Sequence, residues 1–303
     1  MKSIPKISIL ILSLAAALSG CGSSTGPEAA SQPAHGKYQY TLSSVQAVIG
    51  RQGICTDGDQ YWVSDSTKLA RYDKDWKVQA ENREPFTDFE LEVNHIGDID
   101  IYNGEIYAGV EYFVDGQGKN IQVAVYDAST LDFKRVFPFS EETGQMECCG
   151  IAVDPDSKTV YMASWIDDES STFLYMYDLE SGDFKGKLAM DPAPSWIQGV
   201  AYYDGDLYVT CDDGDADQSE PDHMYRIKVN GDRTQGSVVL ERTFDDVTMQ
   251  GEIEGLSFDA ARGQFLLLYN RGARIVQGMP KGFYEGYTEE IHEVFLYDIS
   301  SGK

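Results

Sequence analysis

The sequence predicts an all-β protein built from five copies of one repeating unit, and three observations predict it. A short phrase with a central glycine recurs along the chain, as in the "IQGVAYYDGDLYVT" of residues 197–210. An apolar segment ending in Tyr-Asp follows most copies, and no long amphipathic helix pattern appears. The glycines that anchor the five copies are Gly53, Gly97, Gly150, Gly199 and Gly255.

Each copy contains four predicted strands. Two short apolar segments flank a turn rich in Asp and Gly, a third such as "FLYMYDLES" follows, and a weaker fourth closes the unit, as in "FKRVFPFS". The anchor glycines are 44, 53, 49 and 56 residues apart, and 48 residues follow the last. Four strands at this period are typical of propeller blades. The sequence therefore predicts a single five-bladed β-propeller domain over residues 38–303.

The fifth unit lacks a fourth strand, and the N-terminal segment of the predicted domain can provide it. The fifth unit stops after its third strand, and "YQYTLSSVQAVI", residues 38–49, precedes the first anchor glycine. We expect this segment to pair with the end of the chain and to complete the last blade. Such closure removes open sheet edges, which would otherwise favour aggregation.

The anchor glycines have a predicted packing role. In a propeller the first strand of each blade lines the central channel, where the backbones converge. Glycine carries no side chain that would obstruct this approach. We therefore expect each anchor glycine to lie against a neighbouring first strand.

The N-terminus has the pattern of an export signal. Residues 1–20 carry Lys2 and Lys6 before an apolar run that is short for a membrane span. The ending "LSGC" resembles the bacterial lipobox, which implies that Cys21 carries a lipid and that residues 21–37 are a flexible tether. This resemblance places the protein in the cell envelope, outside the cytoplasm, with the bilayer as its partner. The alternative is an ordinary signal followed by an unrelated cysteine.

The charge of the chain excludes one class of partner. The formal net charge is −26, and loss of a signal with two lysines and no acids would make it −28. A body this acidic does not neutralise phosphates, so we expect no nucleic-acid binding. It also does not adhere to anionic lipid through its own surface. Solubility and cation binding are the properties that such acidity favours.

Four cysteines remain after the signal, and two of them are adjacent. Compartments outside the cytoplasm permit disulfides. Cys148 and Cys149 in "ECCG" therefore form either a vicinal disulfide or two small buried thiols.

One face of the predicted propeller carries the candidate pocket. It is formed by the loops entering each first strand and linking each second strand to the third, and rigid folds often bind ligands on such loops. These positions differ among the five copies, which favours a functional mouth, with drift of exposed residues as the alternative. The candidate pocket residues are Gln52, Asp65, His95, Asp98, Glu111, Trp165, Trp196, Gln198, Asp212, His223, Glu252, Glu254, Asn270, Arg271 and His292.

Two loops at this mouth are long. Residues 211–223, "CDDGDADQSEPDH", offer many oxygen atoms to calcium but lack the later bidentate Glu, so a solvated acidic loop is the alternative. Residues 269–292 combine basic and aromatic side chains, which suit an anionic or ring-bearing ligand unless the loop folds on itself. Those side chains are Arg271, Arg274, Lys281, Phe283, Tyr284 and Tyr287.

The mouth also offers candidate metal ligands. The phrase "IEGLSFD" of residues 253–259 resembles the calcium site of gluconolactonase and paraoxonase propellers, which implies Glu254 as a Ca²⁺ ligand. Those families have six blades, so the resemblance extends to Glu254 alone. Asp98, Asp212 and Asn270 are further candidate oxygen ligands. A zinc site would need His95, His223 and His292 to converge.

Other phrases resemble known propellers. "GIAVDPDSKTVYMAS" and "QGVAYYDGDLYVT" resemble secreted propellers with NHL or quinoprotein-like repeats, which implies the fold and no substrate. "QGVAYYDG" and "NGEIYAGVE" are similar to phrases of the five-bladed plant-type glutaminyl cyclases, although their order along the chain differs.

Three functions fit these observations. The leading hypothesis is a lipid-anchored propeller that binds a small molecule, a glycan or a partner protein at its mouth. The second is a calcium-dependent hydrolase or lyase with His95 or His292 as general base. The third is an envelope scaffold without a small ligand.

Overall fold

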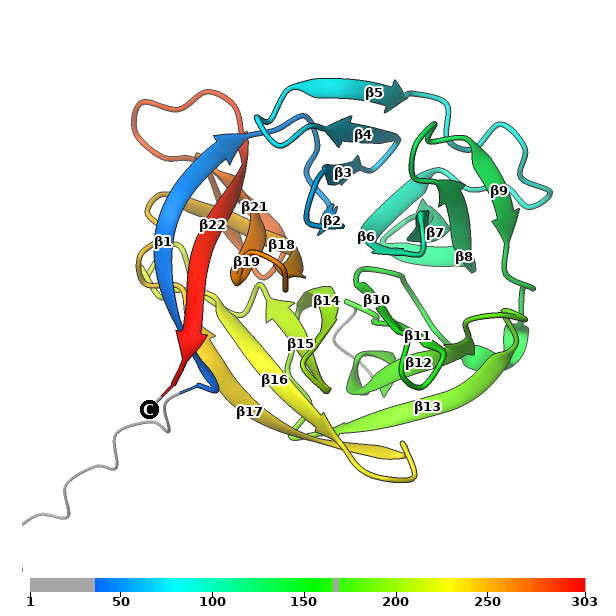
Figure 1. Ribbon diagram of the computed structural model, residues 1–303. Helices are drawn as coiled ribbons and strands as arrows, with labels where there is room; N and C mark the ends of the chain where they lie inside the picture. The colour runs from blue at the N-terminus through cyan, green and yellow to red at the C-terminus, as the bar shows by residue number, and fades with distance from the viewer. Residues whose placement is uncertain (1–35, 166–168, 303) are drawn as a thin grey trace, which may run out of the picture. The chain divides into compact units, whose positions relative to one another are not determined.

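A computed structural model describes residues 36–165 and 169–302 of the chain. They form β-sheets arranged around a common centre, a propeller-type fold that is almost entirely β (Figure 1). The described helical segments are two 3-10 turns, η1 (Glu141–Thr143) and η2 (Glu169–Thr172). No helix in this part of the chain has the length and apolar character needed to cross a bilayer. The predicted signal and Cys21 lie outside the described residues.

The first two units each form a four-stranded antiparallel sheet in sequence order. The strands of the first sheet are β2 (Gly53–Thr56), β3 (Tyr61–Asp65), β4 (Lys68–Tyr72) and β5 (Val78–Asn82). Those of the second are β6 (His95–Tyr102), β7 (Glu105–Val114), β8 (Gln117–Asp127) and β9 (Phe133–Val136).

The third and fourth units join into one sheet of eight strands. Their outer strands pair in parallel over three residues, from Ala189 opposite Gln235 to Asp191 opposite Ser237. The two ends of this sheet, β10 and β14, also contact each other, so the sheet is nearly closed. Its strands in order are β10 (Ile151–Asp154), β11 (Thr159–Met162), β12 (Phe173–Asp178), β13 (Phe184–Asp191), β17 (Gln235–Thr243), β16 (His223–Val229), β15 (Asp206–Cys211) and β14 (Ile197–Tyr203).

The two ends of the described chain pair with each other in the last sheet. β1 (Tyr38–Ala47) lies antiparallel to β22 (Ile291–Ser301), followed by β19 (Gln264–Arg271) and β18 (Gln250–Asp259). The segment predicted to complete the last unit therefore does pair with the end of the chain. Figure 1 shows these two strands, blue and red, side by side.

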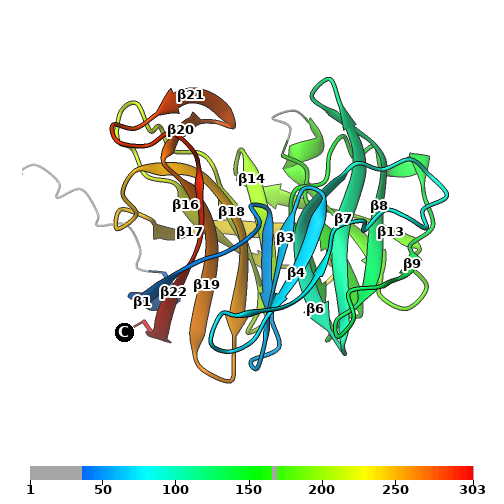
Figure 2. The ribbon, with the colours of Figure 1, turned by 90° about the horizontal axis from the view of Figure 1, so that it is seen from above.

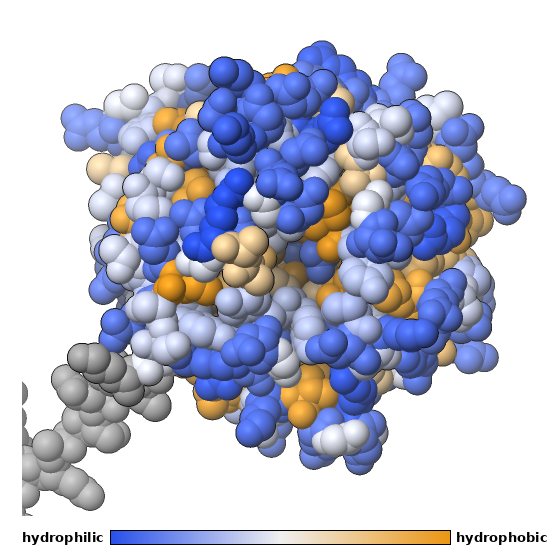
Figure 3. Space-filling model, in the orientation of Figure 1, coloured by the Kyte–Doolittle hydropathy of each residue, from blue (hydrophilic) through white to orange (hydrophobic). Residues whose placement is uncertain are grey.

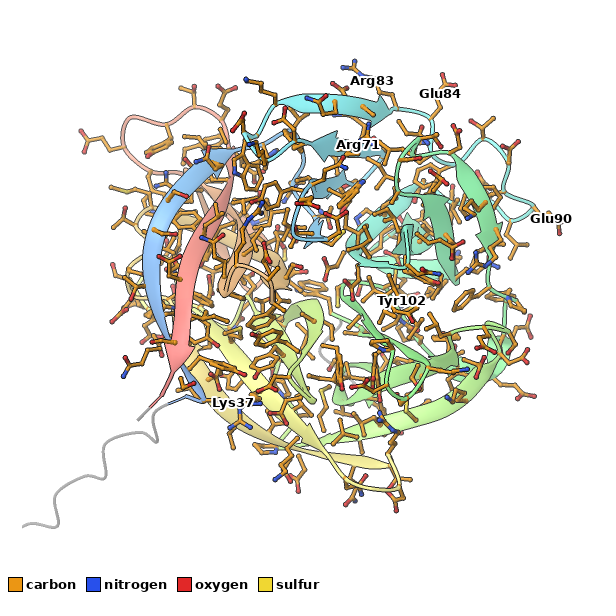
Figure 4. All side chains as sticks on the ribbon, viewed as in Figure 1. Lys37, Arg71, Arg83, Glu84, Glu90 and Tyr102 are labelled. Atoms are coloured by element: carbon orange, nitrogen blue, oxygen red, sulfur yellow. The ribbon has the colours of Figure 1, made fainter. Side chains whose placement is uncertain are left out.

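A buried carboxylate holds the start of β1 on the neighbouring sheet. Glu241 of β17 accepts hydrogen bonds from the backbone N–H groups of Lys37 and Tyr38, at 2.9 and 3.0 Å. It also accepts from Nε of Arg226, at 3.0 Å. Figure 4 labels Lys37, at the N-terminal end of β1. The strand is thus fixed both by the ladder to β22 and by charge-assisted bonds to another sheet.

The recurring Tyr-Asp pairs have a physical role at the ends of strands. The Asp127 carboxylate accepts the N–H groups of Ser129 and Thr130, and Asp178 does the same for two residues after it. Such Asx turns reverse the chain tightly. The preceding tyrosine packs in the apolar clusters that lie between neighbouring sheets, as Tyr126 does with Ile106. Burial of each such side chain stabilises the fold by about 1.5–3 kcal/mol.

The anchor glycines lie where the innermost strands touch. The contacts run in a closed cycle from β2 to β6, β10, β14, β18 and back to β2. A Cβ on Gly199 would lie 2.8 Å from Thr210 Oγ1 and 2.7 Å from the Cα of Gly255. A Cβ on Gly255 would in turn meet Gly53 Cα at 2.7 Å. The backbone contacts leave no room for a methyl group, as the sequence predicted.

Asp98 ties this centre together. Its side chain is buried, and its two oxygens accept the N–H groups of Ile99, at 2.8 Å, and of Val200, at 3.1 Å. Val200 belongs to β14, so the bond connects two innermost strands that are not adjacent in the cycle. Burial raises the pKa of Asp98 well above its usual range, against the effect of these backbone donors.

The substitution Gly199→Ala tests the close approach. We expect it to lower the free energy of unfolding by about 1–3 kcal/mol, because the added methyl group overlaps backbone atoms that cannot turn away. Gly231→Ala is the matched control, since nothing lies within 4 Å of its Cβ position. Chemical denaturation measures both. Equal stabilities of the two variants would contradict the packing role of Gly199.

Candidate functional site

A small cavity opens where the innermost strands begin. Its volume is about 210 Å³, and for each of the five innermost strands a lining residue comes from the first half of the strand or from the segment that precedes it. The residues that line it, which we call the mouth cavity, are Gln52, His95, Phe113, Glu147, Trp165, Gln198, Glu252, Glu254 and Gly278. Figure 2 shows the hairpin of β20 (Ala273–Val276) and β21 (Met279–Phe283) on one face of the ring, with the β18–β19 turn on the other. Figure 3 shows the face of the ring opposite the hairpin, which is largely hydrophilic.

One wall of the mouth cavity is a chain of charged and amide groups. The Arg51 guanidinium lies 2.8 Å from Glu252, 3.9 Å from Glu254 and 3.6 Å from Glu290. Gln198 donates its amide N–H to the second oxygen of Glu252 at 2.7 Å. Burial raises the pKa of Glu252. The Arg51 guanidinium acts in the opposite direction, but it is shared among three carboxyl groups.

Glu254 is the deepest acid of this wall. The Asn270 amide donates to Glu254 Oε1 at 2.7 Å and to the carbonyl of Arg51 at 3.2 Å. Asn270 is fully buried, and within the described part of the chain its side-chain oxygen has no hydrogen-bond partner. Burial raises the pKa of Glu254 well above its usual range, and the neighbouring Glu252 adds to the effect.

A second wall contains an acid–base group. His95 Nδ1 lies 3.1 Å from Glu111 Oε1, and the other Glu111 oxygen accepts the N–H of Cys148 at 2.9 Å. Burial raises the pKa of Glu111 to about 8, and it lowers the pKa of His95. Glu147 accepts the N–H of Trp165 at 2.7 Å, and burial together with Glu111 raises its pKa well above the usual range. Without a cation beside them, the buried groups of this wall therefore favour their uncharged forms.

The adjacent cysteines lie behind this wall as free thiols. Cys148 and Cys149 are both buried and are not joined by a disulfide. Burial raises the pKa of both thiols well above the usual range, so they resist forming thiolates. Of the two interpretations that the sequence left open, the structure therefore agrees with two small buried thiols and not with a vicinal disulfide.

A hairpin rather than an open loop covers part of the mouth cavity. The long segment after β19 forms β20 and β21, and Gly278 at their turn lies against the indole of Trp165. The Gly278 N–H donates to Asp212 at 2.5 Å. Its φ of 68° favours glycine. Arg274 of the same hairpin donates a hydrogen bond to the carbonyl of Lys281 and forms an ion pair with Asp217. Both of its partners therefore belong to the two long loops.

The structure places the fifteen candidate residues in three groups. Six line the mouth cavity: Gln52, His95, Trp165, Gln198, Glu252 and Glu254. Three are bonded to the lining residues: Glu111, Asp212 and Asn270. The others have partners elsewhere: Asp98 with backbone N–H groups, Asp65 near Lys68, His223 with Asp213, Arg271 with Glu293, His292 near Glu290, and Trp196 against Trp165.

Trp196 also lines a second cavity of about 460 Å³, together with Pro192, Asp213, Tyr225 and Gln277. His223 and Tyr225 both contact the Asp213 carboxylate there, at 2.8 and 2.6 Å. Gln277 and Gly278 are neighbours in the chain, so the turn of the hairpin separates this cavity from the mouth cavity.

The candidate metal ligands are only partly together. Glu254 and Asn270 are in contact, whereas Asp98 is bonded to backbone N–H groups and Asp212 to the hairpin. Each histidine of the candidate zinc set has a different carboxylate neighbour. Across residues 36–165 and 169–302, no three His, Cys, Asp or Glu side chains form a metal-binding group. Calcium binding stays a prediction.

Three residues of the mouth cavity are absent from the list of candidate pocket residues: Phe113, Glu147 and Gly278. Phe113 follows Glu111 by two positions in β7, so strand alternation places both on one side of the sheet. That signal was present in the sequence. Gly278 is brought to the cavity by the fold of the hairpin, which strand spacing does not encode.

Comparisons with known proteins give structural neighbours alone. No protein-family model matches the chain, and no curated protein matches it. The chain is similar to Kuenenia stuttgartiensis hydrazine synthase, with 11% identity, a TM-score of 0.44, and coverage of 73% of this chain and 56% of that one. It is similar to a Bacteroides thetaiotaomicron protein of unknown function, with 12% identity, a TM-score of 0.47, and coverage of 88% and 73%. A Bacteroides caccae protein of unknown function has 12% identity, a TM-score of 0.43, and coverage of 72% and 69%.

The pKa of Glu111 predicts a pH-dependent stability. A carboxyl whose pKa is raised in the folded state stabilises the fold below its unfolded pKa, and this contribution is lost as pH rises through about 8. We expect the free energy of unfolding of the wild type, relative to Glu111→Gln, to fall between pH 5 and pH 9. Glutamine keeps an acceptor for the Cys148 N–H but does not ionise. Chemical denaturation across this range measures the difference, and a difference independent of pH would contradict the raised pKa.

Proposed function

We propose that the chain is a five-bladed propeller lipoprotein of the cell envelope, anchored through Cys21, that binds a small molecule in the mouth cavity. The observation that carries the binding function is the convergence on one cavity of polar side chains from the innermost strands β6, β14 and β18 and from the segments that precede β2 and β10. A concave site with a few placed polar groups and perturbed pKa values is the usual form of a ligand site. The closed cycle of innermost strands supports the five-blade count.

The size of the cavity favours a small molecule over the other ligands considered. A volume of about 210 Å³ corresponds to roughly seven water molecules at liquid density. Ligand pockets for drug-sized molecules are larger, about 300–1,000 Å³. A protein partner would need a surface of about 800 Å² and a long glycan an extended groove. The mouth cavity therefore suits a compact ligand.

A propeller hydrolase or lyase is the second candidate. Its supporting observation is that His95 lines the mouth cavity and is hydrogen-bonded to Glu111, as a base oriented by a second group would be. His292 contacts Glu290 instead. Calcium, if bound, would use Glu254 and Asn270 at the same wall and supply Lewis acidity.

A ligand panel tests the binding function. We expect the full-length protein to gain thermal stability with one class among hexoses, small carboxylates, small amines and calcium, by about 2.7 kcal/mol at a concentration 100 times the Kd. Gln198→Ala should weaken this effect because it removes a wall of the cavity. Gln39→Ala, an exposed substitution on β1, is the control. No shift with any class would contradict the proposal and favour a scaffold.

The substitution Cys21→Ser tests the anchor. A lipidated protein is retained in the membrane fraction, because buried acyl CH₂ groups each contribute about 0.8 kcal/mol. We expect Cys21→Ser to move the protein to the soluble fraction, and Ser23→Ala to leave it with the membrane. Fractionation of expressing cells, followed by immunoblotting, measures the distribution. Identical distributions of wild type and Cys21→Ser would argue against lipidation.

A further inference from the structure

The mouth cavity has more acid groups than cationic partners. Glu147, Glu252 and Glu254 line it, and Glu111, Asp212 and Glu290 interact with the lining residues. Among the described residues, the ion pairs of this set come from Arg51, His95 and His292. Glu147 accepts a hydrogen bond from the Trp165 N–H, and Asp212 accepts one from the Gly278 N–H. The cluster therefore lacks positive charge.

Aromatic side chains form the remaining walls. Phe113 lies 5.8 Å from the His95 ring, and Trp165 lies 5.0 Å from Trp196, measured between ring centroids. Ring faces attract a cation but offer no lone-pair ligand, so aromatic walls beside carboxylates suit an organic ammonium better than a metal ion.

We infer that the ligand of the mouth cavity is a compact organic cation, a free ammonium compound of a few carbon atoms. The ammonium lies between Glu147 and the Glu252–Glu254 wall and supplies the missing positive charge. The aromatic walls pack on its methyl or methylene groups. This inference rests on the proposed binding function and names its ligand class.

The position of Arg51 is consistent with this ligand. The guanidinium is already engaged by three carboxylates, at 2.8, 3.6 and 3.9 Å, so it is not a free anchor for an anion. An anionic ligand would add charge to a set that already contains six carboxyl groups.

Choline and its uncharged isostere 3,3-dimethylbutan-1-ol test the inference, because the two molecules have the same shape and differ in charge. Isothermal titration calorimetry on the full-length wild-type protein gives both Kd values, and ethanolamine provides a primary ammonium. We expect choline or ethanolamine to bind, and the uncharged isostere to bind at least tenfold more weakly. This comparison uses one protein and does not depend on any variant folding.

Variants assign the effect to the mouth cavity. Glu147→Gln and Glu252→Gln should each weaken ammonium binding at least tenfold, while thermal unfolding shows that they are folded. Glu180→Gln is the matched control, since its carboxylate pairs with Lys158 on the exposed surface. Equal binding of the isostere, or binding of sugars, carboxylates or calcium alone, would overturn the inference and leave the binding function standing. No binding by any compound in the panel would overturn the proposed function itself.

Discussion

The close approach of the innermost strands is the constraint on which the rest of this structure depends. Around the centre, Gly199 lies against Gly255, and Gly255 lies against Gly53. A side chain on any of the three would overlap backbone atoms. The Asp98 carboxylate occupies the space that these glycines leave and bonds to Val200 of another sheet. A carboxyl group at this depth is tolerated because its oxygens accept backbone N–H groups, and such a centre has little freedom to deform.

A rigid centre positions the site. Gln52, Gln198 and Glu254 each immediately precede an anchor glycine, so the residue that follows each of them is fixed by packing. Their side chains are therefore held next to the packed centre of the innermost strands. The same geometry allows these positions to differ in chemistry, since the packing requirement falls on the glycine and not on the residue before it.

The electrostatics of the mouth cavity follow from burial. Glu111, Glu147 and Glu254 all have raised pKa values, and in each case the largest cause is loss of water around the carboxyl group. Neighbouring acids add to this effect for Glu147 and Glu254, while Arg51 offsets it for the latter. A cation placed beside these acids would favour their ionised forms, which burial alone disfavours.

The sequence by itself determined the repeating units, the role of the anchor glycines, the Asx turns after Tyr-Asp, and the pairing of residues 38–47 with the end of the chain. Each of these depends on local composition and period, which the chain carries directly. The tertiary structure alone decided which mouth residues share a cavity. Strand spacing places His223, Arg271 and Glu254 at equivalent ends, but only packing between sheets gives His223 and Arg271 their own carboxylate partners. It also folds the hairpin that brings Gly278 over Trp165, and it leaves Cys148 and Cys149 as separate thiols, because these outcomes depend on distances between segments far apart in the chain.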